Sequence, residues 1–377
     1  MLGHSVHATS LVRSPEAARS AGEVAVRALA ARNPLWIQES ARYPAPARLA
    51  NKAATIFNRR VSSEFGALLD DIRPDVLHTH SMVELPPTVW DQAARRGVPI
   101  VHTLHDYDLL CIRGALFKDG RKCQPRHAAC RVLSAPKRVS HARIMAVAAV
   151  SQAVLDTHLE HGLFAHLPPE RRSVVWNPAS IERRNTPRRM RTPDGPLRFG
   201  FLGRLTAEKG LGPLLQACRH LPGSGWTLSL AGEGAERAAF ERQASGLPVS
   251  FEGYVDATAF LAGIDVLICA PLWDEPFGLT TIEAYAAGCR VIGSDRGVIG
   301  EVVSRIDPGW TVPAGDVQAL AAAMSRAIER GSTLPAEHQP AVDVLISQLA
   351  PDVVARAYLD LYQMVLPTAQ APLAIHG

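Results

Sequence analysis

The stretch Phe199–Cys218, FGFLGRLTAEKGLGPLLQAC, decides how the second half of this 377-residue chain folds. Its first residues belong to an apolar run from Leu197 to Leu202, which predicts a buried strand. Gly203-Arg204 ends the run, and Lys209-Gly210 begins an apolar helical pattern. Glycine lets a backbone approach a ligand closely, and the free N–H groups of a helix N-terminus favour an anion. With Arg204 and Lys209 at the carboxyl end of a strand, the stretch predicts a diphosphate site in an open α/β sheet.

A second motif follows at Asp274–Gly288, DEPFGLTTIEAYAAG. Glu275 lies in a loop after an apolar strand, and Glu283 lies on the helix that the pattern predicts next. The backbone amides of residues 278–281 lie at the start of that helix, which again suits a phosphate. Taken alone, two surface glutamates beside a helix cap are the commoner explanation. A loop carboxylate can instead accept from sugar hydroxyls, and a helix carboxylate can bind a ribose diol.

Outward from these motifs, short β-branched runs alternate with longer Ala-, Leu- and Arg-rich stretches. This alternation is typical of parallel sheets that carry helices on both faces, so the expected fold class is α/β with doubly wound sheets. The strands are expected at Ser5–Thr9, Val76–His80, Pro99–Leu104, Ile144–Val150, Ser173–Trp176, Leu197–Leu202, Thr227–Ala231, Val249–Phe251, Val266–Cys269 and Val291–Gly293. The helices are expected at Pro15–Ala31, Ala47–Asp70, Leu85–Arg96, Ala153–His161, Gly210–His220, Glu236–Ser245, Thr280–Ala287, Asp316–Glu329 and Val353–Val365.

Composition is that of a globular protein, with 47% hydrophobic and 20% charged residues. No stretch of 18 apolar residues predicts a transmembrane helix, and the N-terminus does not read as a secretion signal. Six cysteines in this length do not make a disulfide scaffold, so a cytoplasmic location is expected. Residues 1–190 carry 27 basic and 16 acidic side chains, and the remainder carries 13 and 20. The basic half suits phosphates, an anionic membrane surface or nucleic acid, or reflects an Arg-rich solvated surface.

The Pro- and Arg-rich segment 177–196 marks the domain boundary. We expect an N-terminal domain over residues 1–180, a linker over 181–196 and a second domain over 197–350. The apolar helix in 351–366 must bury one face, and we expect it to pack back on the N-terminal domain. Residues 367–377 are expected to form a tail.

Together the motifs are more specific than either alone. Gly-Arg-x4-Lys-Gly, followed about 65 residues later by Glu-x-Phe-Gly-x4-Glu-Ala, closely resembles the donor half of retaining glycosyltransferases of family 4, which have the GT-B fold. The resemblance extends over roughly 76–365. It includes a Gly-x-Gly after the second strand of this domain, a Gly-Tyr-Val turn after the third and an aspartate before the strand that leads to Glu275. These residues are Gly232, Gly234, Gly253, Tyr254, Val255 and Asp265.

The resemblance implies two doubly wound Rossmann-like domains that face a cleft: an N-terminal acceptor-side domain over residues 1–180 and a nucleotide-sugar donor domain over 197–350. It also implies a role for each matching residue. Arg204 and Lys209 would bind the donor diphosphate together with the helix start at Gly278, Leu279 and Thr280. Glu283 and the turn Gly253-Tyr254-Val255 would bind the ribose and base. Glu275 would hold the sugar, and His105, in the segment Gly97–Cys111, would reach the cleft beside the reacting centre.

The activity implied is transfer of a sugar, with retention of configuration, from a nucleotide diphosphate sugar to an acceptor hydroxyl. The acceptor is expected to be a glycan or a lipid-linked molecule in cell-surface glycan or glycolipid synthesis. No cofactor, metal or nucleic-acid partner is expected, and the enzyme is placed in the cytoplasm, with peripheral contact at the anionic inner face of the membrane. The nucleotide, UDP or GDP, stays open.

Three further features of the N-terminal half bear on this. Asp106-Tyr-Asp108 imitates a metal-binding Asp-x-Asp motif, but its surroundings match the family's His-Asp element. Cys111, Cys123, His127 and Cys130 lack the usual zinc spacing, so we expect them to pack an irregular loop. That loop is basic and is the candidate contact for an anionic acceptor, through Arg113, Lys118 and Arg121.

The start of the chain departs from the family. Gly3-His4-Ser5-Val6 matches the family's second strand, so the first strand and its Gly-rich loop are expected to be absent. A gap or a collapsed pairing is then expected between Ser5–Thr9 and Val76–His80. Two alternatives therefore stay open beside the transferase: a degenerate GT-B protein that binds a nucleotide or a partner without turnover, and a nucleotide-sugar epimerase of the same fold.

Overall fold

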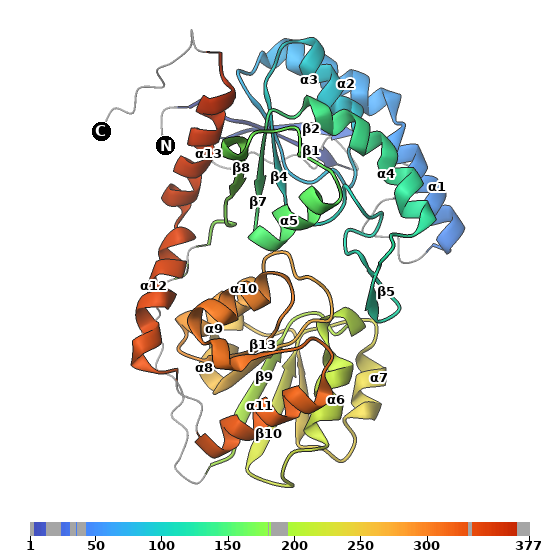
Figure 1. The fold of residues 1–377 in the computed structure, drawn as a ribbon. Helices are drawn as coiled ribbons and strands as arrows, with labels where there is room; N and C mark the ends of the chain where they lie inside the picture. The colour runs from blue at the N-terminus through green and yellow to red at the C-terminus, as the bar shows by residue number, and fades with distance from the viewer. Residues whose placement is uncertain are drawn as a thin grey trace.

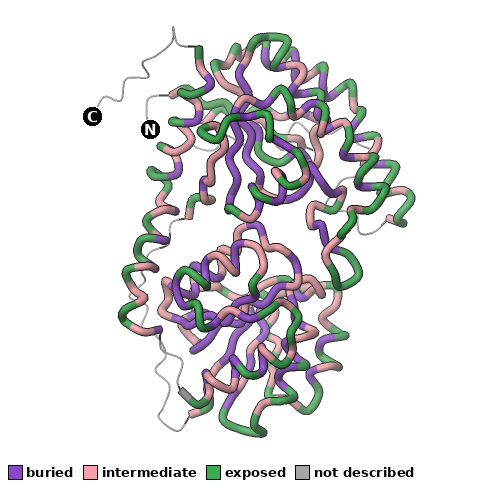
Figure 2. The backbone as a smooth tube through the Cα atoms, in the orientation of Figure 1, coloured by how far each residue is buried: buried purple, intermediate pink, exposed green. Residues whose placement is uncertain are grey.

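The computed structural model describes residues 4–12, 24–30, 35, 43–179, 181, 195–330 and 334–367. These residues form two α/β domains, one above the other, with parallel sheets at their centres (Figure 1). Figure 2 shows the strands of both sheets as the buried interior, with exposed residues on the helices around them. The expected class, doubly wound α/β, is confirmed.

The C-terminal domain contains a six-stranded parallel sheet in the order β11-β10-β9-β12-β13-β14. In chain order within the domain this is 3-2-1-4-5-6, the Rossmann order, whose switch point lies between β9 and β12. The strands are β9 (Leu197–Leu202), β10 (Trp226–Ala231), β11 (Val249–Gly253), β12 (Val266–Cys269), β13 (Arg290–Ser294) and β14 (Thr311–Val312). Ligands bind such sheets beyond the carboxyl ends of the strands at the switch point, where both sequence motifs lie.

Helices cover both faces of this sheet. They are α6 (Leu211–Cys218), α7 (Arg237–Gln243), α8 (Ala257–Gly263), α9 (Leu279–Ala286), α10 (Gly297–Ile306), α11 (Val317–Arg330) and α12 (Gln339–Gln348). The sequence patterns predicted α6, α7, α9 and α11 but not α8, α10 and α12. Helix α10 was missed because its opening residues, Gly297 and Gly300, weaken a helical pattern.

The N-terminal domain contains a four-stranded parallel sheet in the order β3-β4-β7-β8. Its strands are β3 (Leu77–Thr79), β4 (Ile100–Leu104), β7 (Ala146–Ala149) and β8 (Arg172–Val174). The helices around it are α1 (Ala45–Ile56), α2 (Arg59–Ile72), α3 (Thr88–Arg95), α4 (Ala128–Ser140) and α5 (Gln152–Glu160). Helix α4 was not predicted, since Pro136 lies inside it.

Two helix predictions in this domain are wrong. The single helix expected over Ala47–Asp70 is divided at Asn58, whose side chain accepts from the Val61 N–H and caps α2. Where Pro15–Ala31 was expected to be helical, Ala25–Ala30 is the strand β2; residues 13–23 and 31 lie outside the described residues.

Strand β1 (His7–Val12) pairs in parallel with β2 and forms a separate two-stranded sheet. In the described part of the chain, no ladder joins β1 to β3, so β1 does not continue the main sheet. The pair lies against the N-terminal core through Leu29 and Leu11.

The loop after β4 contains a hairpin that the sequence analysis did not predict. Strands β5 (Phe117–Lys118) and β6 (Arg121–Lys122) pair antiparallel across Asp119-Gly120, which both have positive φ angles of 51° and 77°. Positive φ at both central residues is the geometry of a type I′ turn, for which Asp-Gly is a strong signal. In Figure 1 the hairpin extends from the upper domain toward the lower one.

The last helix, α13 (Pro351–Val365), returns the chain to the N-terminal domain. Its Val354, Leu361 and Val365 bury an apolar face against β4 and β7, where Val101 and Ala148 complete the cluster. Most of the segment between the domains, residues 180 and 182–194, and the tail from residue 368 lie outside the described residues. Among the described helices none has the length and apolar character needed to cross a membrane.

Candidate active site

The two motifs of the C-terminal domain meet at the switch point of its sheet. The Lys209 Nζ lies 2.6 Å from the Glu275 Oε2, although the residues are 66 apart in sequence. The Trp273 indole N–H donates to the same carboxylate oxygen at 3.0 Å, and the ammonium lies 5.5 Å from the centre of the Trp273 ring. With side chains only 20% and 15% exposed, Lys209 and Glu275 form a largely desolvated ion pair.

Gly210 explains how Lys209 reaches this point. It caps α6 in the left-handed conformation, with φ at 81°. A Cβ at this position would lie 2.0 Å from the Ala270 carbonyl oxygen, which follows β12. Only glycine therefore allows α6 to begin so close to the neighbouring strand, and that approach brings Lys209 beside the Glu275 loop.

The Glu275 loop is also held by the start of α10. The Val298 N–H donates to the Glu275 carbonyl oxygen at 3.0 Å. A Cβ at Gly297, whose φ is 52°, would lie 2.4 Å from that oxygen. Gly297 was missed in the sequence analysis, and the signal for it was the Asp-Arg-Gly stretch directly after the strand β13.

The other predicted donor residues lie at the same edge of the sheet but are not all in contact. Arg204 is 66% exposed and its guanidinium contacts the Glu208 carboxylate at 3.7 Å, a weak surface pair. Gly278 caps α9, Leu279 and Thr280 begin that helix, and Glu283 lies half-buried one turn further on. At the carboxyl end of the edge strand β11, Tyr254 follows Gly253 and is 93% exposed; Val255 beside it is half-buried.

His105 follows β4 on the N-terminal domain and is held by a second histidine. The His105 Nε2 lies 2.9 Å from the Nδ1 of His80, and burial lowers the pKa of His105. Behind it, His78 contacts the Tyr362 hydroxyl of α13 and the Thr103 hydroxyl, both at 2.7 Å. The alternation His78-Thr79-His80, which places both rings on one side of the strand, was the signal missed.

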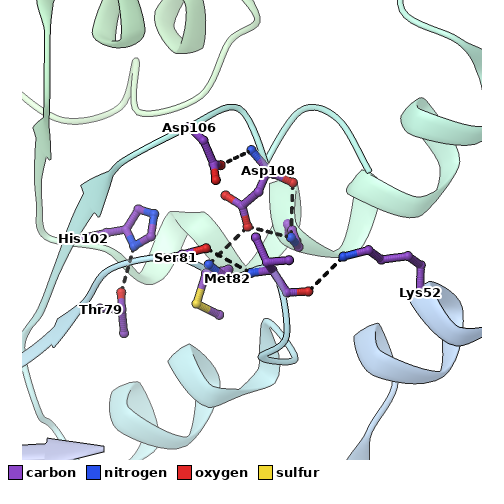
Figure 3. A network of polar contacts seen from close by, with 9 residues as sticks. Lys52, Thr79, Ser81, Met82, His102, Asp106 and Asp108 are labelled. Atoms are coloured by element: carbon purple, nitrogen blue, oxygen red, sulfur yellow. Dashed lines mark hydrogen bonds and ion pairs between the residues drawn. The ribbon is translucent and has the colours of Figure 1, made fainter. Parts of the chain in front are cut away.

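Asp106 and Asp108 are engaged within the N-terminal domain (Figure 3). The Lys137 ammonium donates to the Asp108 Oδ2 at 3.0 Å, and the Met82 N–H donates to the same oxygen at 3.1 Å. Burial opposes the charge of Asp108, but Lys137 outweighs it and lowers the pKa of this carboxyl. Asp106 accepts from the Asp108 N–H, and burial with the neighbouring charge raises the pKa of Asp106 to about 7. Asp108 is thus the buried counter-ion of Lys137.

The cysteines and the basic loop have separate roles. Cys111 and Cys130 are buried in the N-terminal core with their sulfurs 3.9 Å apart, so these two pack the loop as expected. Within the described ranges, no three His, Cys, Asp or Glu side chains converge as metal ligands would. Arg113, Lys118 and Arg121 are exposed, as an acceptor contact requires. Lys122 instead crosses to the other domain, where its Nζ lies 2.7 Å from the Asp274 Oδ2.

Three further contacts bring the domains face to face. The Tyr107 hydroxyl donates to the Asp274 carbonyl oxygen at 3.1 Å. The Ala153 N–H at the start of α5 donates to the Glu301 carboxylate of α10 at 2.6 Å. The rings of Trp176 and Phe277 lie 5.8 Å apart. The ends of both sheets that carry His105 and Glu275 therefore face each other across the domain boundary.

Two Rossmann-like domains that face each other in this way are the arrangement that the resemblance to GT-B glycosyltransferases implies. The sequence model described as Glycosyltransferase Family 4 matches residues 2–183, and the one described as Glycosyl transferases group 1 matches residues 196–330. The chain belongs to the GT-B glycosyltransferases.

A relative of known activity agrees with this family, and an uncharacterized one is also similar to the chain. A glycogen synthase from Mycobacterium tuberculosis is 30% identical over 299 residues, which cover 77% of this chain and 69% of the relative. An uncharacterized 42.6 kDa protein in the cps region of Klebsiella pneumoniae is 27% identical over 254 residues. That match covers 67% of this chain and 65% of the relative's length.

Solved structures show the same fold. Sucrose-phosphate synthase from Thermosynechococcus elongatus superposes with a TM-score of 0.68 at 17% identity, covering 96% of this chain and 89% of that one. HepE from Anabaena, solved with UDP and glucose, superposes with a TM-score of 0.63 at 17% identity, covering 90% and 86%. The GT-B fold expected from the motifs is confirmed.

Proposed function

We propose that this chain is a retaining glycosyltransferase that moves a sugar from a nucleotide diphosphate sugar to an acceptor hydroxyl. The observation that carries the proposal is the Lys209–Glu275 pair at the switch point, 2.6 Å apart and largely desolvated. A cation and a carboxylate side by side match the two parts of the donor, because the diphosphate is anionic and the sugar presents hydroxyl donors. In HepE, which shares the fold, UDP and glucose are bound.

On donor binding, Lys209 exchanges its bond to Glu275 for the diphosphate, and Glu275 turns to the sugar hydroxyls. Arg204, exposed on the same loop, and the start of α9 at Gly278, Leu279 and Thr280 supply further positive potential. Glu283 binds the ribose, and Tyr254 covers the base. Lys209, Arg204 and the start of α9 serve as the counter-charge of the diphosphate in place of a metal ion, so the proposed reaction needs neither metal nor cofactor.

The bond-making step uses the leaving group as its base. The acceptor oxygen attacks the anomeric carbon on the face that the diphosphate leaves, and the bond from that carbon to the diphosphate oxygen breaks. The acceptor proton passes to the leaving phosphate. Lys209 stabilises the charge that develops on the diphosphate, and His105 contacts the sugar from the facing domain.

The acceptor side of the proposal rests on the N-terminal domain. The exposed Arg113, Lys118 and Arg121 suit an anionic, lipid-linked acceptor. Phe57, Val132 and Val139 are 66%, 69% and 75% exposed on or beside the neighbouring helices α1 and α4. Exposed arginines flank them at Arg59, Arg60 and Arg131. Exposed apolar side chains with exposed arginines beside them in the sequence suit contact with an anionic membrane surface, which is consistent with a role in cell-surface glycan synthesis.

This membrane contact is tested by flotation with phosphatidylglycerol vesicles. We expect the wild-type chain to float with the vesicles and the variant Phe57→Ser/Val132→Ser to lose this binding.

The function itself is tested by incubating the protein with a panel of UDP- and GDP-linked sugars, with and without EDTA. The release of nucleotide and the fate of the sugar are followed by nuclear magnetic resonance. We expect release of nucleotide from one sugar with retained anomeric configuration, unchanged by EDTA, and abolished in Lys209→Ala. Isomerised donor would indicate the epimerase, and binding without release would indicate the degenerate protein.

A further inference from the structure

Asp274, which directly precedes Glu275, is the point at which the N-terminal domain grips the Glu275 loop. The Lys122 Nζ lies 2.7 Å from its carboxylate, and the Tyr107 hydroxyl donates to its backbone carbonyl oxygen at 3.1 Å. Tyr107 is 1% exposed, and the Asp274 side chain is 15% exposed. One residue of the donor domain therefore receives both a charge and a hydrogen bond from the other domain.

Both partners of Asp274 are themselves held in place. Lys122 closes the β5–β6 hairpin, where it pairs with the buried Phe117 across the type I′ turn. The Tyr107 ring stacks on His158 of α5, with centroids 6.0 Å apart and planes inclined by 15°. Because Lys122 and Tyr107 are each held within the N-terminal domain, their contacts with Asp274 fix the position of Asp274 relative to that domain.

The far side of the same loop is fixed by the donor domain alone. Lys209 and Trp273 bind the Glu275 carboxylate, and the Val298 N–H binds its carbonyl oxygen. The backbone of residues 274–275 is therefore fixed from two directions, one of which exists only while the domains are closed.

We propose that Lys122 and Tyr107 are positioning residues that set Glu275 through Asp274, so that the sugar-binding carboxylate is correctly placed only in the closed molecule. When the domains separate, Asp274 loses both partners and its loop is held from the donor domain only. The nucleotide contacts around Lys209 and Glu283 do not depend on this grip. The role of Glu275 toward the sugar rests on the proposed function, whereas the grip on Asp274 does not.

The first experiment measures closure without any ligand. Small-angle X-ray scattering is recorded for the wild-type chain, Lys122→Met, Asp274→Asn and the charge reversal Lys122→Asp/Asp274→Lys. Lys118→Met on the same hairpin is the matched control, because its ammonium contacts only the adjacent Asp119 among the described ion pairs. We expect a larger radius of gyration in the two single variants, wild-type values in the control, and recovery in the reversal. Wild-type scattering from Lys122→Met and Asp274→Asn would overturn the proposal.

The second experiment separates positioning from mere folding. Binding of UDP or GDP, whichever the wild-type chain prefers, is compared with binding of the matching nucleotide sugar by titration calorimetry, with unchanged thermal unfolding as the check on folding. We expect Lys122→Met to bind the nucleotide within about twofold of wild type and the nucleotide sugar about tenfold more weakly, the loss of roughly one charge-assisted contact. Equal losses for both ligands would overturn the positioning role. A wild-type chain that binds neither the nucleotide nor the nucleotide sugar would contradict the proposed function. The scattering experiment would still test whether the contact with Asp274 holds the two domains together.

Discussion

At the scale of single residues, the account depends on Lys209 and Glu275 acting on different parts of one donor. Their 2.6 Å pair holds each side chain in place and keeps both from being buried without a partner. Arg204 is far more exposed, so its contribution to binding is more strongly screened by solvent.

Replacing Lys209 by alanine is expected to weaken binding of a nucleoside diphosphate by about 1.5–3 kcal/mol, because one buried charge-assisted contact to the distal phosphate is lost. The loss for the nucleoside monophosphate should be clearly smaller. Arg204→Ala is expected to show the same preference with a smaller loss. Calorimetric titration of both nucleotides measures this, with Lys118→Ala as the control. Equal losses for the two nucleotides would mean that Lys209 does not bind the distal phosphate.

The two glutamates, Glu275 and Glu283, are expected to bind different parts of the donor, so their substitutions should have different effects. Glu283→Ala should lower the affinity for every nucleotide by about tenfold, because each carries the ribose. Glu275→Ala should leave nucleotide affinity nearly unchanged and reduce turnover or sugar discrimination, because the free nucleotide has no sugar for it to hold. Nucleotide titrations and steady-state kinetics on both variants decide the assignment, and the opposite pattern would reverse the two roles.

At the scale of helices and strands, the sequence predicted those features that depend on neighbouring residues, such as strand bounds and helix starts. The strands β9 and β12 have the predicted bounds, and the glycine at 210 marks the start of α6, since apolar runs and glycines carry these signals themselves. The pairing of β1 with β2, and the grip of Lys122 on Asp274, depend on residues distant in sequence, so no local pattern predicts them. The hairpin at Asp119-Gly120 could have been predicted from the sequence, because Asp-Gly is a signal for a two-residue hairpin turn.

Helix α5 buries a histidine whose titration should be visible in stability. His158 is fully buried, and burial lowers its pKa to about 4, below the 6.5 of a free imidazole. At pH values between about 4 and 6.5, this histidine binds a proton in the unfolded chain but stays neutral in the folded chain. The free energy of unfolding therefore falls as the pH drops from 7 toward 4.

His158→Phe keeps a ring against Tyr107 and removes this titration. We expect the variant to resemble wild type at pH 8 and to gain on the order of 1–2 kcal/mol relative to wild type at pH 5. Urea unfolding at the two pH values measures the difference. A difference between the two proteins that does not change with pH would show that the pKa of His158 is the same in the folded and unfolded chains, and would contradict this account.

At the scale of the whole molecule, the arrangement of the two domains brings the chemistry together. Glu275 and Lys209 lie on the donor domain, His105 lies on the other, and Tyr107, Lys122 and the Ala153–Glu301 contact join the two faces. The long return of the chain through α12 and α13 ties the donor domain to the N-terminal sheet along a second path (Figure 1). The domain limits at residues 180, 196 and 350 remain predictions.

The measurement that tests the central claim most directly is a crystal structure of the protein with its preferred nucleoside diphosphate. The account predicts the phosphates between Lys209 and the start of α9, the ribose on Glu283, and the 2.6 Å bond between Lys209 and Glu275 opened in favour of the diphosphate. A nucleotide bound elsewhere, with the Lys209–Glu275 pair intact, would contradict the assignment of this site as the donor site.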